Sequence, residues 1–440
     1  MASSNTRKRL IYSWGSNASG LLLTGDRVDR FKPELIDLDN FINQHSNSCS
    51  VQDAIEQATP ENHNTNTSGL GDQCTLKTSG AFTIIHTSTT CAVGDFLLSQ
   101  QCNGNLPSIH ILKFPSSLKI EQVNVGWTCA SFISSSGDLY MCGSNASGQC
   151  GLPSRRRFLS EPTKVDLPPN INNNDKSIKV IQVAHGWKHN LVLSSDGVVW
   201  GFGSNVHNQL TSNTGKTLHP QIVSENKKIR QIAAGMKFSL LLDDRNIIWG
   251  RGNNSFSQLG LCSVKKCAEW VRIEPLLSDQ DVQASRCDLS IKSMVCGWHH
   301  CIILLSIGRV FAWGRSDLGQ CGVVQQSTQV VSLDVRPVNN GVEADESRMY
   351  YIKAINASAE SSYLLTEKGE LWSCGWNEHG NLGHSFDQTN DENQSKSFSA
   401  SLKKVEFSKK DAVVESIEAG GASVFAICHP NEVSIGKSPL

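Results

Sequence analysis

The sequence lacks the features that mark several common classes of protein. Its 440 residues contain no apolar run approaching 18 residues, and Met1–Arg9 has no apolar core of the kind found in signal peptides. Lys and Arg number 40 against 41 Asp and Glu, and basic residues cluster only in short runs such as Arg155-Arg156-Arg157. Nucleic-acid binding needs concentrated positive charge. We therefore expect no nucleic-acid partner, no membrane insertion and a cytoplasmic location, with the nucleus also open.

Motifs that carry catalysis are missing as well. The chain has no Gly-x-Ser-x-Gly, no phosphate-binding Gly-x-x-x-x-Gly-Lys-Ser/Thr and no His-Glu-x-x-His. Its carboxylates are scattered through turns without a pairing pattern. We expect no catalytic residue and no cofactor, although nucleotide exchange on a GTPase would need no such motif.

What the sequence does contain is a frame that recurs five times. A glycine is followed at the eleventh position by a turn residue, and the sixth position after that holds a second glycine. The linkers between successive copies vary in length, while the two internal spacings do not. Fixed spacings with variable linkers indicate a repeat protein. The copies are Gly126–Gly137–Gly143, Gly186–Gly197–Gly203, Gly235–Asn246–Gly252, Gly297–Gly308–Gly314 and Ser358–Gly369–Gly375.

Each frame predicts a small antiparallel sheet. The apolar run between the first two marks reads as a buried strand, and a second strand climbs to the last glycine. The turn between them needs a positive φ, which Gly supplies and which Asn246 tolerates. A short strand precedes the frame and a fourth lies in the linker. Sheets repeated about every 60 residues indicate propeller blades, with a solenoid as the alternative.

The chain ends decide between these two architectures. Residues 10–17 carry only the end of a frame, and residues 417–427 carry only its start. Pairing them closes a ring and removes exposed sheet edges. The fold class is therefore all-β, a seven-bladed propeller whose N- and C-terminal strands share one blade.

The blades and their connections follow from this count. A single domain should span residues 10–428, with polar insertions at 40–75 and 384–404 expected to be disordered and a tail at 429–440. The segments 95–98 and 103–106 read as the remnant of the one blade in which the frame fails. The blades are expected at 11–25 with 413–428, 76–110 (degenerate), 120–152, 178–211, 229–261, 291–323 and 352–384.

The loop after the last glycine carries a family resemblance. It reads Gly-Ser-Asn-x-x-Gly-Gln-Cys-Gly at 143–151 and Gly-Arg-Ser-x-x-Gly-Gln-Cys-Gly at 314–322. This resembles the regulator-of-chromosome-condensation repeat, a seven-bladed propeller, over nearly the whole chain. Within that family, residues 313–317 and 376–380 look most like the secretion-regulating guanine nucleotide exchange factors.

That resemblance implies a function in protein–protein interaction. The chain would regulate a small GTPase or an exocytic subunit, and exchange activity stays open. The run Gly375–Gly380 is also similar to fungal propellers that partner a small metal-binding electron carrier in diphthamide synthesis and tRNA wobble-uridine modification. A ubiquitin-ligase or chromatin adaptor has no supporting sequence feature.

The cysteines and most aromatic residues are expected to pack the core. Cys142 and Cys374 align with Phe202 and Trp313, while Cys262 and Cys267 have no partner pair for zinc, so we expect no metal site. His189 and His300 share a position that also accepts Phe and are expected to hydrogen-bond between strands. A further position, three residues before the last glycine, holds Tyr12, Tyr140, Trp200, Trp249, Phe311 and Trp372.

Six residues are candidates for partner binding. Strand counting places the Gly-Trp turns and the Gly-Ser-Asn loops at the same end of the propeller, and Trp is frequent among interface anchors. An alternative is that the indoles fold over the glycines and cap the blade rims. The candidates are Trp127, Trp187, Trp298, Trp376, Glu378 and His379.

Overall fold

The apolar run of each frame forms a strand that is covered on both faces. All six residues of β12 (His189–Ser194) and of β16 (Phe238–Asp243) are buried. A strand packed between two neighbouring sheets needs no polar face, which explains why these segments read as nearly continuous apolar runs. Each becomes the second strand of a four-stranded antiparallel sheet.

The computed structural model describes residues 9–38, 40–41, 75–87, 90–94, 109–152, 156–169, 178–224, 226–261, 264–273, 289–324, 330–333, 335, 338–339, 342–343, 350–384, 397–409 and 412–430. The innermost strands of the seven sheets are β3 (Thr75–Thr78), β7 (Ile120–Val125), β11 (Val180–His185), β15 (Ile229–Ala234), β19 (Ile291–Cys296), β25 (Ile352–Ala357) and β29 (Ala412–Gly420). The second strands are β4 (Phe82–His86), β8 (Cys129–Ser134), β12, β16, β20 (His300–Leu305), β26 (Ser361–Thr366) and β30 (Ser423–Pro430).

The outer half of each sheet contains two more strands. The third strands are β5 (Thr90–Gly94), β9 (Leu139–Ser144), β13 (Val199–Ser204), β17 (Ile248–Asn253), β21 (Val310–Gly314), β27 (Leu371–Trp376) and β1 (Leu10–Gly15). The outermost strands are β6 (Ile109–Leu112), β10 (Phe158–Val165), β14 (Lys216–Ile222), β18 (Lys266–Ile273), β22 (Val331–Ser332), β28 (Phe398–Lys404) and β2 (Arg30–Ile36). A separate small hairpin pairs β23 (Val338–Asn339) with β24 (Val342–Glu343).

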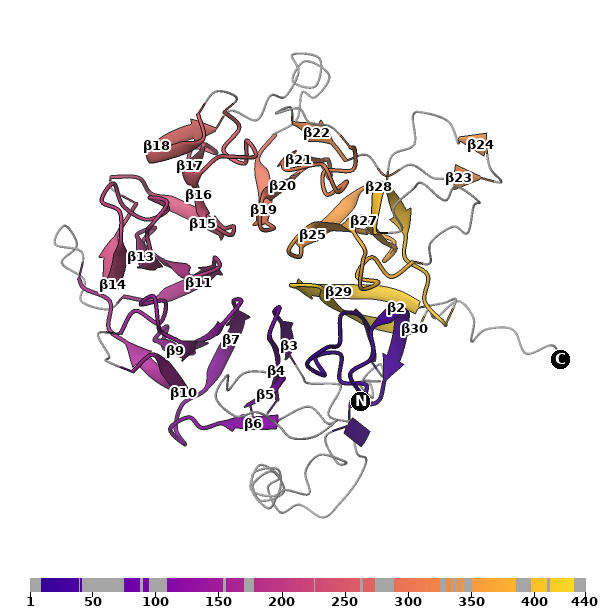
Figure 1. Ribbon diagram of the computed structural model, residues 1–440, viewed down its shortest axis with the longest axis horizontal. Coiled ribbons are helices and arrows are strands. Elements are labelled where there is room, and N and C mark those ends of the chain that lie inside the picture. Colours follow the sequence, from indigo (N-terminus) through magenta and orange to yellow (C-terminus); the bar gives the residue numbers. More distant parts are fainter. Residues whose placement is uncertain are drawn as a thin grey trace, which may run out of the picture.

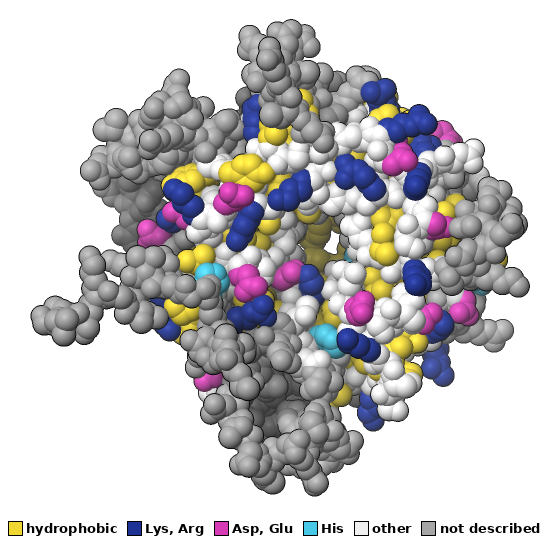
Figure 2. All heavy atoms as spheres, turned by 180° about the vertical axis from the view of Figure 1, so that it is seen from behind, with side chains coloured by type: hydrophobic (Ala, Val, Ile, Leu, Met, Phe, Trp, Pro, Cys, Tyr) yellow, Lys and Arg dark blue, Asp and Glu magenta, His cyan; other side chains and the backbone are white. Residues whose placement is uncertain are grey.

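The seven sheets stand around a central axis as the blades of a propeller (Figure 1). Blades 1 to 7 are numbered in the order of β3, β7, β11, β15, β19, β25 and β29. The last sheet has the order β2-β1-β30-β29, so each end of the chain contributes two strands. The predicted closed seven-bladed ring is confirmed. Figure 2 shows the opposite face, where the central opening is visible as a hollow.

The core consists of seven hydrophobic clusters, one at each boundary between blades. The boundary between blades 2 and 3, for example, packs Met141 and Cys150 against Val192 and Trp200. Tyr12, Trp200 and Phe311 are buried in such clusters, and Trp249 packs against one, which confirms their structural role. Cys142 and Cys374 are fully buried free thiols, as predicted.

Blade 1 shows why its frame escaped detection. Ser79 occupies the position of the first glycine, because its N–H bonds to Phe82 O as that of Gly126 bonds to Cys129 O. The stretch from Ser79 to Gly94 is shorter by two positions than the stretch from Gly126 to Gly143, because the β4–β5 hairpin is tighter. The segments expected as this blade's remnant, 95–98 and 103–106, lie outside the described residues.

One predicted insertion is wrong in part. Phe398–Lys404, placed within a disordered segment at 384–404, is the outermost strand β28, with Trp376 opposite Phe398. The outer strand of a blade has one exposed face, so its polar sequence disguised it. Strand β30 likewise extends to Pro430, into the expected tail. Residues 42–74, 385–396 and 431–440 lie outside the described residues.

We expect the last glycine of the frame to be the position least able to accept a side chain. Gly143 has φ +103°, and a Cβ there would lie 2.5 Å from Thr128 O. Gly25 has φ +83° but open space around it, so it is a matched control. Gly143→Ala should cost about 3 kcal/mol of unfolding free energy and Gly25→Ala about 1 kcal/mol, measured by urea denaturation. Equal losses would contradict a role for the close approach.

Acid should destabilise the propeller through its buried histidines. His189 and His300 bond to Ser239 and Ser362 of the next blades at 3.0 and 3.1 Å, and burial lowers their pKa to about 3 and about 4. The unfolded chain takes up protons below about pH 6.5 while the folded chain does not, so stability falls from there toward about pH 4.

His300→Phe tests this pH dependence, because Phe238 fills the equivalent position in blade 4. The variant should lose about 2 kcal/mol less stability than the parent between pH 7 and pH 5, since each histidine contributes up to about 1.4 kcal/mol per pH unit. Chemical denaturation at the two pH values measures the difference. An unchanged difference would exclude His300 as a source.

Candidate functional site

A tight turn joins the first two strands of each blade and carries the predicted tryptophans. In blade 2 the Gly126 N–H donates to Cys129 O at 2.7 Å, and Trp127 lies between them. Cys129 pairs with Gly143, the last glycine of the frame, so the Gly-Ser-Asn loop starts at this same end. This confirms the geometric expectation that both features share one end of the ring, which we call the tryptophan end.

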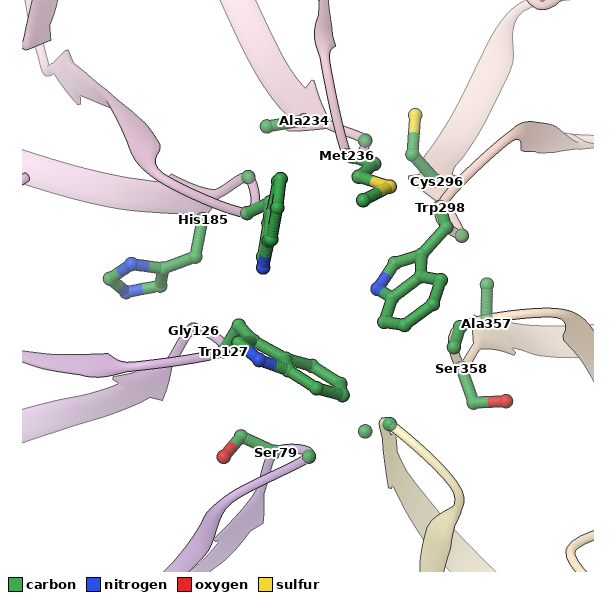
Figure 3. A pocket seen from close by; sticks show the side chains of 18 of the residues that line it. Ser79, Gly126, Trp127, His185, Ala234, Met236, Cys296, Trp298, Ala357 and Ser358 are labelled. Atoms are coloured by element: carbon green, nitrogen blue, oxygen red, sulfur yellow. The ribbon is translucent and has the colours of Figure 1, made fainter. Parts of the chain in front are cut away.

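Trp127 and Trp298 point into the central opening (Figure 3), and all three turn tryptophans line the cavity there. Trp127 and Trp298 meet edge to face, with ring centroids 5.0 Å apart, and Trp187 lines the same cavity of about 110 Å³. All three are half-buried. They cover the axis of the propeller, not the rims of the blades as the alternative interpretation proposed.

Small residues on the other side of the ring make room for these indoles. The position directly after the first glycine, the tryptophan slot, holds Met236 in blade 4 and small residues in three other blades: Ala359, Gly421 and Gly80. A Cβ on Gly80 would lie 1.9 Å from the Trp127 ring. Large side chains on blades 2 to 5 therefore depend on small ones on blades 6, 7 and 1.

Backbone hydrogen bonds tie the turns to one another around the axis. The N–H of Met236 donates to Trp298 O at 3.0 Å, that of Trp298 to Ala359 O at 2.7 Å, and that of Ala359 to Gly421 O at 3.1 Å. Each bond crosses from one blade to the next. The turns of blades 4 to 7 are thus fixed relative to each other, and this end of the ring presents a rigid surface.

The next position in the turn, the charged slot, was missed by sequence reasoning. It holds Lys188, Lys237, His299 and Glu360 in blades 3 to 6, but Thr128, Ala422 and Ala81 in the others. The frame aligns these residues two places after the first glycine, so comparing that position across repeats would have revealed the change from small to charged side chains.

Glu360 is the best-connected charged group at this end. Its side chain is buried and accepts hydrogen bonds from His299 Nδ1 at 2.6 Å, Gln320 Nε2 at 2.7 Å and an Arg315 guanidinium nitrogen at 3.1 Å. Burial alone would raise the pKa of Glu360, but the hydrogen bond from His299 and the neighbouring positive charges lower it below the usual value. Glu360 is therefore a fixed negative charge.

Aromatic rings flank the charges around the axis. Phe256, exposed to 41%, packs against the His299 ring at 4.9 Å and lies 5.1 Å from the Arg315 guanidinium. On the other side, Lys188 Nζ stands 4.3 Å from the Trp187 ring. The surface therefore combines held charges with partly exposed aromatic faces.

Trp376, Glu378 and His379 form a second group, farther from the axis. The Trp376 and His379 rings meet edge to face at 5.3 Å, and His379 Nδ1 lies 2.8 Å from Asp29 of blade 7. Glu378 is exposed, while the Trp376 N–H donates to Glu360 O at 2.9 Å. The six predicted residues therefore lie at one end but in two groups, with Glu360 between them.

Metal ligands and thiols are the two kinds of reactive group that the described residues make informative. Among them, no group of three or more His, Cys, Asp and Glu side chains could hold a metal ion. Burial raises the pKa of Cys129 and Cys374 to about 12, which makes both poor nucleophiles. No helix in the described part of the chain is long and apolar enough to cross a membrane.

Comparison with known proteins gives relatives along most of the chain. The secretion-regulating guanine nucleotide exchange factor of Mus musculus is 25% identical over 391 residues, covering 85% of this chain and 75% of the relative. Its Bos taurus counterpart is 25% identical over 278 residues, covering 60% of this chain and 57% of the relative. This chain thus spans little more than half of the cattle protein and three quarters of the mouse protein.

Solved structures share the fold at lower identity. Prp20p of Saccharomyces cerevisiae is 17% identical with a TM-score of 0.69, covering 97% of this chain and 93% of that structure. Human WBSCR16 is 17% identical with a TM-score of 0.69, covering 96% of this chain and all of that structure. The family model for the RCC1-like domain matches residues 62–433. The chain therefore belongs to the family of RCC1-like propellers.

Proposed function

We propose that this propeller regulates a small GTPase, or an exocytic subunit that acts with one, by binding it at the tryptophan end. The curated mouse and cattle relatives carry the name of secretion-regulating exchange factors, and the yeast propeller Prp20p has binding properties toward Gsp1p and histones. These relationships support the class of function. The side chains at the tryptophan end of this chain support the location of the binding site.

The observation that carries the proposal is the arrangement of charge around the axial tryptophans. Lys188 and Lys237 lie on blades 3 and 4, and the buried carboxylate of Glu360 lies on blade 6. Partly exposed Trp, Phe and Arg side chains, the types enriched at interface centres, stand between them. Opposite charges at fixed positions would set the orientation of a partner.

Nucleotide exchange would need only differential binding. A surface that binds the nucleotide-free GTPase more tightly than the loaded form shifts the population toward release of the nucleotide. Such a surface must keep its conformation when the partner binds. The backbone hydrogen bonds that join the turns of blades 4 to 7 provide that rigidity.

Capture of a GTPase in its two nucleotide states tests the proposal. The full chain is immobilised and presented with cell lysate containing either EDTA, which strips Mg²⁺ and nucleotide, or Mg²⁺ with GTPγS. We expect a small GTPase to be retained preferentially with EDTA, and the purified GTPase to release fluorescent GDP faster when the propeller is added. Lys188→Ala with Lys237→Ala should weaken both effects about tenfold, as expected for two interface charges.

Lys228→Ala with Lys292→Ala is the matched control, because both lysines are exposed at the other end of the ring. This pair should bind and release like the parent chain. If both pairs behave alike, the tryptophan end is not the site. Retention that does not depend on nucleotide state would indicate an adaptor in place of an exchange factor.

Trp376 favours a second candidate function, that of an accessory partner for a small metal-binding electron carrier. The equivalent residues in five other blades are Ser16, Ser144, Ser204, Asn253 and Arg315, so a half-buried indole beside an exposed carboxylate occurs at this position in blade 6. An indole next to an exposed carboxylate offers a small partner both an apolar anchor and a negative charge.

Trp376→Ala with Glu378→Ala should separate the two candidates. Trp376 packs on His379 outside the seven core clusters, so its loss should change the melting temperature by less than about 3 °C, a surface effect. Affinity capture read by mass spectrometry should lose the metal carrier and keep a GTPase if the second function holds. Loss of the GTPase alone would assign this patch to the first function, and extensive unfolding would make Trp376 a structural residue.

A further inference from the structure

The end of the ring opposite the tryptophans carries a set of lysines that the sequence disperses. They occupy two frame positions: the residue before the innermost strand (Lys119, Lys179 and Lys228) and the second residue of that strand (Lys292 and Lys353). The carbonyls of Lys119, Lys179 and Lys228 accept hydrogen bonds from Ser135, Ser195 and Asp244, at the start of the hairpin between the second and third strands. We call this the hairpin end and these five residues the lysine ring.

Figure 2 shows the hairpin end, with Lys and Arg side chains spaced around the central hollow. Each blade from 2 to 6 contributes one member of the lysine ring, and Arg230 of blade 4 adds another cation. Neighbours in the ring are separated by about a whole repeat in the sequence, so the five lysines do not form a run in the chain. The sequence pattern alone therefore does not reveal the lysine ring.

Within the described residues, the lysine ring is less paired than the cations of the neighbouring blades 1 and 7. None of its five members forms an ion pair there, whereas Lys77 pairs with Glu418 and Arg9 with Glu415 on blades 1 and 7. Lys292 Nζ bonds to Lys353 O, and Lys353 Nζ to Val414 O, both at 3.2 Å. The ammonium groups of Lys292 and Lys353 are thus held along the innermost strands of blades 5 to 7, where like charges raise the local potential.

Apolar side chains share this surface. Ile181, 44% exposed, and Tyr351, 40% exposed, occupy the same two frame positions in blades 3 and 6. One acidic residue interrupts the ring, because Glu121 is the second residue of the innermost strand in blade 2. Three more acids lie farther from the axis, in the hairpin turns between second and third strands: Asp196, Asp244 and Glu367. A wide nucleic-acid duplex would meet these acids at the rim, while a single extended chain could follow the inner ring of cations.

We propose that the hairpin end binds an acidic polypeptide segment, with carboxylates on the lysine ring and apolar side chains against Ile181 and Tyr351. The segment would lie beside or across the central opening. This inference goes beyond the proposed function, because it uses the opposite end of the propeller and stands whether or not the tryptophan end binds a GTPase.

Binding of a defined peptide tests the proposal. The probe is a fluorescent peptide of alternating glutamate and leucine, compared with the same peptide carrying glutamine for glutamate and with a short DNA duplex. We expect anisotropy to show binding of the acidic peptide to the full chain, weakening as salt rises from about 0.1 M to 0.5 M. The glutamine peptide and the duplex should bind less tightly.

Charge reversal on the ring supplies the decisive comparison. Lys228→Glu, Lys292→Glu and Lys353→Glu together should weaken peptide binding at least about tenfold. Lys32→Glu, Lys216→Glu and Lys265→Glu, three exposed lysines toward the tryptophan end, should leave it unchanged. If the first triple variant does not keep the parent's melting temperature, the same three lysines changed to Gln replace it.

Three outcomes would overturn the proposal: no binding of the acidic peptide, equal losses in the two triple variants, or tighter binding of the duplex. The last would assign the ring to nucleic acid. The GTPase capture described above tests the other end of the ring, so the proposed function and the peptide proposal can fail independently of each other.

Discussion

The close approach of the third strand's last glycine to the turn between the first two strands is the constraint on which the tryptophan end depends. This glycine has a φ between +102° and +113° in all seven blades. At Gly375 a Cβ would lie 2.5 Å from Glu360 O. Without that Cβ, the following N–H reaches the same carbonyl, as Trp376 does at 2.9 Å. The turn and the outer loop are thereby joined into one surface, and the charged slot is held at its centre.

A ring built from seven such units becomes a specific binding surface only where the repeats differ. At the tryptophan end the tryptophan slot and the charged slot vary between blades, while the last glycine of the frame is present in every blade. A large side chain on one side of the axis requires a small residue on the other side, as the Trp127 ring beside Gly80 shows. The asymmetry of the axis is therefore a property of the whole ring and cannot be assigned to one blade.

The sequence predicted the fold well because the frame is set by local backbone geometry. Five blades and the shared closing blade follow from glycine spacing and strand patterns alone. Blade 1 escaped because its hairpin is shorter than the others, and β28 because an outer strand of polar residues resembles a loop. The six site candidates share one end, as strand counting predicted, but their division into two groups depends on ring closure. The contact between Glu360 and His299 was missed because it joins two blades and lies between positions far apart in the sequence.

Frame position decides at which end of the propeller a side chain emerges. A residue two places after the first glycine lies at the tryptophan end, and a residue before the innermost strand lies at the hairpin end. The net charge of −1 is the total for the whole chain, so it does not reveal that five lysines lie at one end of the propeller. Because the two ends share no side chains, a partner on the axial tryptophans and a partner on the lysine ring would not compete for residues. The same ring could then hold both partners at once. An adaptor requires this arrangement, whereas an exchange factor that uses a single face does not require it.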